Sequence, residues 1–206
     1  MMGASTSATR RKASVGAVCV TLMCLAFGAA VFTDQARARE LGLTPSHVFG
    51  LWTNINAALV SVADASSGGH NLDDSLTSTK PDRFENKKPA DVLARAIEFR
   101  AKLDRLLAEH GMAPTKRYPR GAGRVTPSVV FLNSGLLLDA VVGWIIANTA
   151  KRQLVSPFYA HHAFSGKTPS DVFGMVDLAN RRIDRILAIA ESCHFFVQEP
   201  INCSTP

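Results

Sequence analysis

The chain has 206 residues, of which 47% are hydrophobic and 19% charged, and its formal net charge is +6. The apolar fraction excludes an intrinsically disordered protein, and the length suits one domain or two small ones. Its 14 glycines and 10 prolines are too few for collagen or a low-complexity chain.

Residues 1–38 have the pattern of a secretory signal peptide. A basic cluster at 10–12 precedes an apolar run at 15–32, and small residues stand at Ala36 and Ala38. Cleavage is expected after Ala38, with a second possible site earlier in the chain. The alternative is an uncleaved membrane anchor, because the apolar run approaches the ~20 residues that span a bilayer. We therefore expect an exported protein, either periplasmic in a bacterium or secreted.

Loss of this segment changes the charge and the cysteine count. The mature chain keeps 19 basic and 16 acidic residues, a net charge of +3, which gives no case for nucleic-acid binding. Two of the four cysteines remain, Cys193 and Cys203. In an oxidising compartment they predict a disulfide, which would stabilise the fold by ~2–3 kcal/mol. The alternative is two free thiols.

Four similar segments recur along the mature chain. Their sequences are TPSHVFG from residue 44, KPADVL from 88, TPSVVF from 126 and TPSDVFG from 168. Successive prolines are 44, 38 and 42 residues apart, and a Phe-x-x-Lys pattern precedes the second and fourth segments at 84–87 and 164–167. Such regular recurrence predicts a protein built from internal repeats.

Each segment is typical of a helix N-terminus. Threonine caps an unpaired backbone N–H, proline suits the first helical position, and an aspartate in the first turn is favoured by the helix dipole. Lysine at 88 is a poor cap, so the second start is the least well specified. The residues assigned to helix starts are Thr44, Pro45, Pro89, Asp91, Thr126, Pro127, Thr168, Pro169 and Asp171.

Hydrophobic periodicity predicts helices over about 45–62, 89–109, 127–150 and 169–192. Three of them have one apolar stripe. The outer face of the second carries charged pairs at i,i+4 spacing, and that of the fourth carries a charged run that is expected to be solvated. The pairs are Asp91/Arg95, Glu98/Lys102 and Arg100/Asp104, and the run comprises Arg181, Arg182, Asp184 and Arg185.

The third helix is nearly all apolar between residues 129 and 147. Such a helix is either central to a core or inserted in a membrane. Asp139 near its middle would cost ~2.5–3.5 kcal/mol in a membrane, which favours the core. Connectors of about 63–87, 111–125 and 156–167 are long enough to run back along a helix, so helix directions stay open. The predicted fold is all-α: a four-helix bundle of four helix-plus-long-connector repeats, spanning 39–206 after the cleaved signal.

Signatures of catalysis are absent from the sequence. It has no HExxH, GxSxG, GxxxxGK[ST] or CxxCH motif, so no enzyme activity and no cofactor are expected. Asp139 is the one carboxylate expected to be buried, and with Asn133 it could line a ligand site or merely bond to a neighbouring helix. His161 and His162 in the last connector are a weaker hint, without the spacing of a metal site.

The most basic stretch, Lys116-Arg117-Tyr118-Pro119-Arg120, with Arg124 after it, has two interpretations. A solvated linker is the simpler one. Otherwise, outside the cytoplasm, it suits an anionic lipid, a cell-wall polymer or an acidic protein better than single-stranded nucleic acid.

Three functions are therefore open. The first is a non-catalytic exported protein that binds another envelope or secreted protein, or contributes to an envelope assembly. The second is a small-ligand or cation-binding bundle of the sensory type. The third is a membrane-associated protein that uses the apolar helix 129–147. The sequence does not predict the oligomeric state.

Overall fold

The computed structural model describes residues 41–66, 74–119, 123–148 and 155–195, all of which belong to the compact unit Ala38–Pro206. The expected signal peptide and Cys203 lie outside these residues, as does the side chain of Cys193, so the predicted disulfide lies outside them too. The described residues form helices and no strand. The all-α prediction is confirmed.

Four long helices start where the sequence predicts them: α2 (Pro45–Ser66), α4 (Pro89–Glu109), α5 (Pro127–Asn148) and α6 (Pro169–Phe195). Helix α2 continues about one turn beyond the predicted end. Two short elements inside the connectors were not predicted. These are α3 (Asp74–Ser78) and the 3-10 helix η1 (Ser156–Tyr159), which packs against α2.

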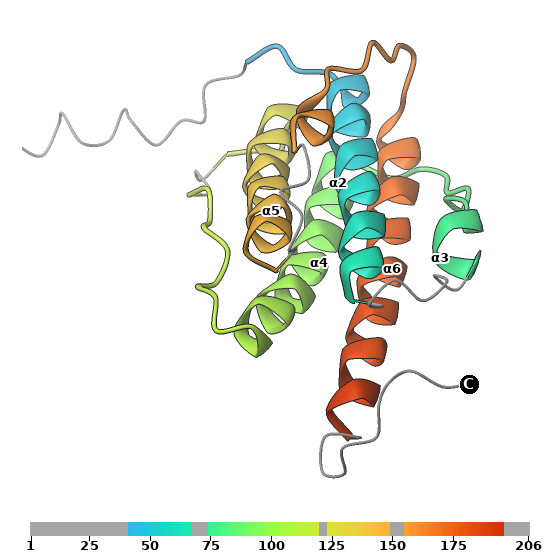
Figure 1. Ribbon diagram of the computed structural model, residues 1–206. Coiled ribbons are helices and arrows are strands. Elements are labelled where there is room, and N and C mark those ends of the chain that lie inside the picture. The colour runs from blue at the N-terminus through green and yellow to red at the C-terminus, as the bar shows by residue number, and fades with distance from the viewer. Residues whose placement is uncertain (1–40, 67–73, 120–122, 149–154, 196–206) are drawn as a thin grey trace, which may run out of the picture. The chain divides into compact units, whose positions relative to one another are not determined.

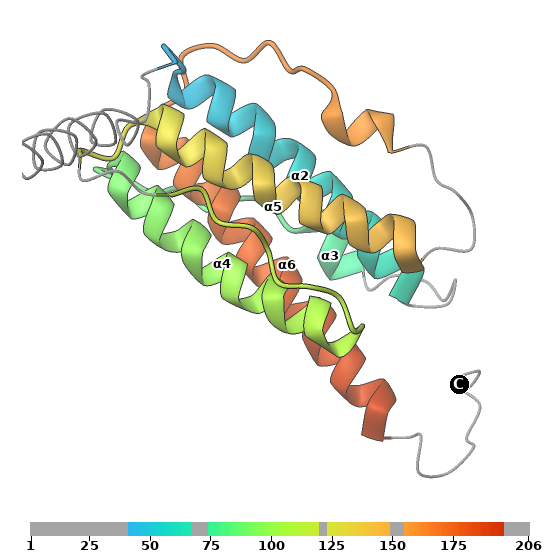
Figure 2. The same cartoon turned by 90° about the vertical axis from the view of Figure 1, so that its left-hand side faces the viewer.

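All four long helices run in the same direction (Figures 1 and 2). Their first turns meet at one end, around an apolar gap of only ≈ 10 Å³. This gap is lined by the proline and the valine of every start segment, namely Pro45, Val48, Pro89, Val92, Pro127, Val130, Pro169 and Val172. Each connector therefore returns along the length of the helices, which explains why the connectors are long.

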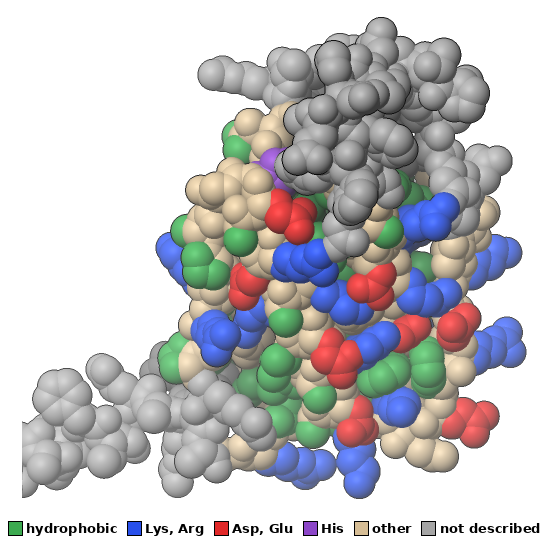
Figure 3. All heavy atoms as spheres, turned by 90° about the horizontal axis from the view of Figure 1, so that it is seen from below, with side chains coloured by type: hydrophobic (Ala, Val, Ile, Leu, Met, Phe, Trp, Pro, Cys, Tyr) green, Lys and Arg blue, Asp and Glu red, His purple; other side chains and the backbone are tan. Residues whose placement is uncertain are grey.

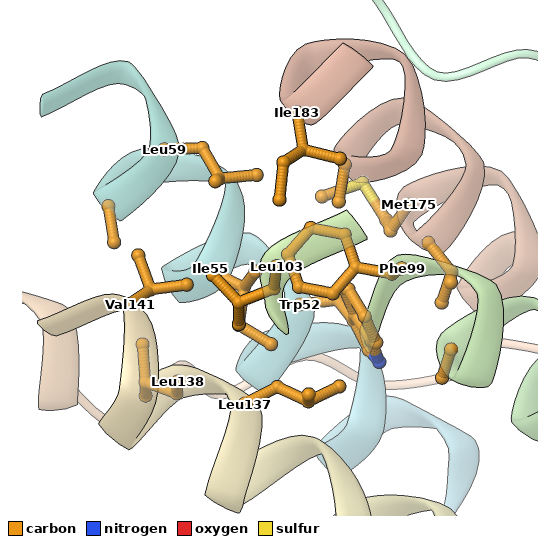
Figure 4. Close-up of a cluster of buried hydrophobic side chains, with 14 of the residues drawn as sticks. Trp52, Ile55, Leu59, Phe99, Leu103, Leu137, Leu138, Val141, Met175 and Ile183 are labelled. Atoms are coloured by element: carbon orange, nitrogen blue, oxygen red, sulfur yellow. The ribbon is translucent and has the colours of Figure 1, made fainter. Parts of the chain in front are cut away.

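The core lies between the four helices, with α2 packed against α5 and α6, and α4 packed against α6 and, less extensively, α5. Figure 4 shows side chains from all four helices meeting around Trp52 and Phe99, whose rings contact edge-on at 5.4 Å. The apolar stripes of α2, α4 and α6 are buried, except that Leu51 and Ala190 are only partly so. Burial of these stripes is the main stabilising contribution to the fold.

Helix α5 is long and apolar enough to cross a membrane by length and composition, and 56% of its most apolar window is buried inside the protein. Its buried side chains pack in the core that it shares with α2 and α4. A core helix has the same composition, because it needs no polar face.

Two arginines predicted on outer, solvated faces are instead buried. Arg100 of α4 is 7% exposed and Arg182 of α6 is 9% exposed. Arg182 donates from Nε to the carbonyl of Leu76 in α3 and from Nη1 to Asn56 in α2, at 3.1 Å each. It therefore holds α3 and α2 against α6. A periodicity argument counts an arginine as polar and misses this arrangement.

At three of the helix starts, a serine hydroxyl accepts a hydrogen bond from the segment that precedes another helix. The backbone N–H of Lys167, just before α6, donates to Ser46 Oγ at 3.1 Å, and that of Lys87, just before α4, donates to Ser170 Oγ at 3.0 Å. The N–H of Leu41, before α2, donates to Ser128 Oγ of α5 at 3.2 Å. In each case the acceptor is the serine after the start proline.

The Phe-x-x-Lys pattern takes part in two of these junctions. Phe164 meets Phe49 of α2 edge-on at 4.9 Å, and Phe84 meets Phe173 of α6 at 4.8 Å. At each junction the lysine ammonium lies over the aromatic ring of the helix, a favourable cation–π contact. The fourth pair, α4 and the segment before α5, has Ala90 at the serine position and so lacks the hydroxyl acceptor.

The helix starts use different caps. At α6, Asp171 accepts from the backbone N–H and hydroxyl of Thr168 at 2.7 and 2.8 Å, and Thr168 Oγ1 accepts from the Asp171 N–H. At α4, Asp91 accepts from the Lys88 N–H at 2.8 Å, but the Lys88 ammonium has no acceptor to offer in return. At α2 the Nδ1 atom of His47 takes the place of the carboxylate.

Candidate functional site

An open cleft of ≈ 410 Å³ lies at the seam between α4 and α5, where the two helices pack least extensively. Helix α4, helix α5 and the connector between them all contribute to its walls. The lining residues are Leu93, Ile97, Arg100, Ala101, Asp104, Arg117, Tyr118, Pro119 and Asn133. Its volume falls in the ~300–1,000 Å³ range of clefts that hold small molecules.

Arg100 is the feature that distinguishes this cleft. Its Nη2 donates to Oδ1 of Asn133 at 3.2 Å, and its buried Nε has no hydrogen-bond partner. No carboxylate of the described residues forms an ion pair with it. A buried charge normally requires an opposite charge or a full set of hydrogen bonds, and Arg100 has neither.

The other two arginines at the helix contacts are compensated, although the buried Nε of Arg95, like that of Arg100, has no hydrogen-bond partner. Arg95, five residues earlier on α4, forms ion pairs with Glu98 and Asp177. Burial lowers the pKa of Arg95, but the bonds to these carboxylates outweigh that effect and raise it. Arg182 donates to two backbone carbonyls and to the side-chain oxygen of Asn56. Of the three arginines Arg95, Arg100 and Arg182, only Arg100, in the α4–α5 cleft, has a guanidinium whose charge is not compensated.

The electrostatics of the cleft are net positive. Burial lowers the pKa of Arg100, the positive charge of Arg117 lowers it further, and the carboxylate of Asp104 opposes both effects. Arg100 nevertheless stays protonated, because free arginine ionises above pH 12. Asp104 is already engaged, since its Oδ1 accepts from the backbone N–H of Thr115 at 2.7 Å. An anion in the cleft would relieve the unfavourable charge of Arg100.

The remaining walls are largely apolar. Leu93 is buried, Ile97 is 50% exposed, and Tyr118 is half-buried. A large aliphatic side chain half exposed beside a buried charge gives the cleft one polar and one apolar part. This combination suits a ligand with an anionic end and an apolar body.

Of the four ligand residues predicted from the sequence, only Asn133 lines the cleft. It is 5% exposed, and its Nδ2 donates to the carbonyl of Val129 at 3.0 Å while Oδ1 accepts from Arg100. Asn133 therefore limits the orientation of the guanidinium, and both polar atoms of its amide are hydrogen-bonded within the protein.

The expectation that Asp139 is buried is wrong. Asp139 is exposed, and its Oδ1 accepts a hydrogen bond from the hydroxyl of Tyr159 in η1 at 2.9 Å. Six residues separate it from Asn133, which turns it well away from that residue around α5. Partial burial of Tyr159, together with the hydrogen bond and the negative charge of Asp139, raises the pKa of Tyr159 to about 12.

The two histidines do not join this site. His161 is exposed, whereas His162 is half-buried with Nε2 2.7 Å from Asn54 Oδ1, and Asn54 Nδ2 donates to the carbonyl of Ala160. These contacts fasten the last connector to α2. Among the described residues, no three His, Cys, Asp or Glu side chains are grouped so that they could hold a metal ion.

Sequence reasoning missed Arg100 and underestimated Arg117 and Tyr118. The i,i+4 spacing of Arg100 and Asp104 predicted an exposed pair, but Asp104 bonds instead to Thr115 and Arg100 turns toward α5. The sequence predicts that the basic stretch from 116 is either a solvated linker or a contact for an anionic partner. Two of its residues, Arg117 and Tyr118, line the cleft. Arg120 lies outside the described residues. Nothing in the sequence around this stretch predicts that it lies beside α4.

Comparisons with protein-family models, with curated proteins and with solved structures gave no match. The functional argument therefore depends on the chemistry of the cleft. Its titratable side chains are two arginines, one aspartate already bonded to the backbone, and one tyrosine. This set can bind and orient an anion, but it pairs no nucleophile with a general base.

Proposed function

We propose that this chain is an exported, non-catalytic binding protein whose ligand carries an anionic group held in the α4–α5 cleft. In this proposal, residues 1–38 direct export, and α2, α4, α5 and α6 form a four-helix bundle of repeated units. The four start segments in one register and the serine junctions between them support the repeat. The basic and apolar pattern of residues 1–38 supports export.

The single observation that carries the proposed activity is the burial of Arg100 with neither an acidic partner nor a full set of hydrogen bonds. Desolvating a guanidinium costs several kcal/mol unless it is compensated, so retaining one in a cleft points to compensation by a bound anion. The exposed face in Figure 3 supports a local site, because basic and acidic side chains are interspersed there rather than separated into one charged surface.

A small ligand fits the cleft better than a protein surface does, because the arginine is 7% exposed and lies within a concave site. The partner-protein function expected from the sequence is a second candidate. Ile97, half exposed at the same cleft, favours it, since a partner could cover this side chain while an acidic residue reaches Arg100.

The fluorescent probe 1-anilinonaphthalene-8-sulfonate, an apolar body with one anionic group, tests the proposal. We expect saturable binding of one probe per chain, weakened at least ~10-fold by Arg100→Met, because loss of a buried charge contact costs ~2–5 kcal/mol. Arg105→Met is the matched control, as Arg105 lies on the same helix and forms a surface pair with Glu109. Equal binding by the wild type and Arg100→Met would refute the proposal.

A further inference from the structure

We infer that the α4–α5 cleft selects a monocarboxylate with an apolar body over a phosphate ester of the same size. This inference rests on the proposed function and adds the chemical class of the ligand. It depends on three features of the site: the geometry of Arg100, the carboxylate of Asp104 and the apolar residues beside them.

The first feature is the donor set. Only Nη2 of Arg100 is engaged within the protein, by Asn133, so Nη1 and the second N–H of Nη2 can bond a ligand. A planar guanidinium pairs with a planar carboxylate through two parallel hydrogen bonds. Asn133 limits the rotation of the guanidinium and so favours one orientation of such a pair.

The second feature is the charge balance. Arg100 and Arg117 bring two positive charges to the cleft and Asp104 brings one negative charge, so a single negative charge neutralises the lining. A phosphate monoester carries ~1.5–2 negative charges at pH 7, and its excess charge would face Asp104. Asp104 is held in place by the Thr115 N–H and cannot turn away without losing that bond.

The third feature is the apolar wall formed by Leu93, Ile97 and Pro119 next to the charged end. A carboxylate without an apolar body, such as acetate, would leave Ile97 in contact with water. Burial of aliphatic chain contributes ~0.8 kcal/mol per CH₂ group in apolar surroundings, so the body of the ligand would supply much of the affinity, whereas the charged end would supply orientation.

Calorimetric titration of the purified protein with decanoate, decyl phosphate, 1-decanol and acetate tests this inference. We expect decanoate to bind at one per chain, at least about fivefold more tightly than decyl phosphate, with 1-decanol and acetate weaker still. Arg100→Met should abolish the preference for decanoate over 1-decanol. Asp104→Asn keeps an oxygen for the Thr115 N–H and removes the charge, so it should narrow the gap between decanoate and decyl phosphate.

The outcomes separate the two levels of the proposal. If decyl phosphate binds the wild type as tightly as decanoate, or Asp104→Asn leaves the ratio unchanged, the ligand class is wrong while anion binding stands. If decanoate binds equally well to Arg100→Met, this cleft is not the site. If neither decanoate nor decyl phosphate binds, the proposed function fails as well. The urea midpoint of each variant, measured in parallel, shows that it is folded.

Discussion

The ammonium group of Lys167 lies 4.6 Å from the ring centre of Phe49, on the first turns of α2. Lys87 has the same relation to Phe173 of α6, at 4.5 Å. In both places the backbone N–H of the lysine also donates to a serine hydroxyl on that helix. Each junction therefore joins the segment before one helix to the beginning of another.

The glycines at these two junctions should respond differently to substitution. A Cβ at Gly174 would lie 2.6 Å from the backbone oxygen of Asp82, whereas a Cβ at Gly50 would meet its nearest atoms at 3.5 Å. Gly174→Ala should destabilise the fold by ~1–3 kcal/mol. Gly50→Ala should be neutral or stabilise it by up to ~1 kcal/mol, because alanine is the better helix former. Urea denaturation measures both, and equal effects would contradict the difference between the junctions.

The two buried arginines give a second matched comparison. Arg182→Met leaves the side-chain oxygen of Asn56 and the carbonyl of Leu76 without their donors, and should destabilise the protein by ~1–3 kcal/mol. The double variant Arg100→Met/Asn133→Leu removes a charge that lacks an acidic partner together with its one hydrogen-bonded partner. It should leave the ligand-free stability unchanged or raise it by ~1 kcal/mol. A loss of several kcal/mol in the double variant would mean that Arg100 has a structural role.

Stability should depend on pH through Asp171. The backbone and hydroxyl hydrogen bonds from Thr168, together with the nearby charge of Lys167, lower the pKa of Asp171, although its slight burial opposes this. A lowered pKa stabilises the fold above the unfolded value of ~3.9, and this contribution is lost as the pH falls through the folded value. Asp171→Ala should therefore cost ~1 kcal/mol at pH 7 and progressively less below pH 4. Guanidinium denaturation at pH 7, 4 and 3 measures this, and a cost independent of pH would argue against the cap.

The cap of α2 can be improved. His47 Nδ1 accepts from the Thr44 N–H at 3.1 Å and lies 2.9 Å from the Thr44 hydroxyl. In α6 an aspartate makes the corresponding contacts. His47→Asp should raise the melting temperature, with a gain of ~0.5–1 kcal/mol at pH 7, because a carboxylate also interacts favourably with the helix dipole. His47→Ala is the companion variant and should lower it.

The sequence predicted the parts of the fold that local chemistry determines. Proline with a neighbouring threonine or aspartate specifies a helix start from adjacent residues alone, and all four starts agree with the structure. The stripe around Trp52 and Ile55 follows from the period of the helix. The connectors do not determine the directions of the helices. A connector that is long enough to return along a helix can equally join two antiparallel helices, so the parallel arrangement could not be predicted.

The candidate site could not be predicted for the same reason, because it depends on which helices are neighbours. Asn133 was recognised as a polar residue in an apolar helix, but its partner Arg100 lies 33 residues away along the chain. Asp139 looked equivalent to Asn133 within α5, and only the position of η1 shows that it faces Tyr159. Burial of Arg100 depends on which helix lies beside α4, a property of the assembled fold.

Parallel helices have a consequence for how the chain folds. The packing of α2 against α6 joins residues such as Asn56 and Arg182, which are 126 positions apart in sequence. Most helical proteins begin with contacts between successive antiparallel helices and fold rapidly, because those contacts close short loops. Here the first long helix completes its packing only when the last one is present. An emerging chain therefore cannot complete its core before its last helix has been made.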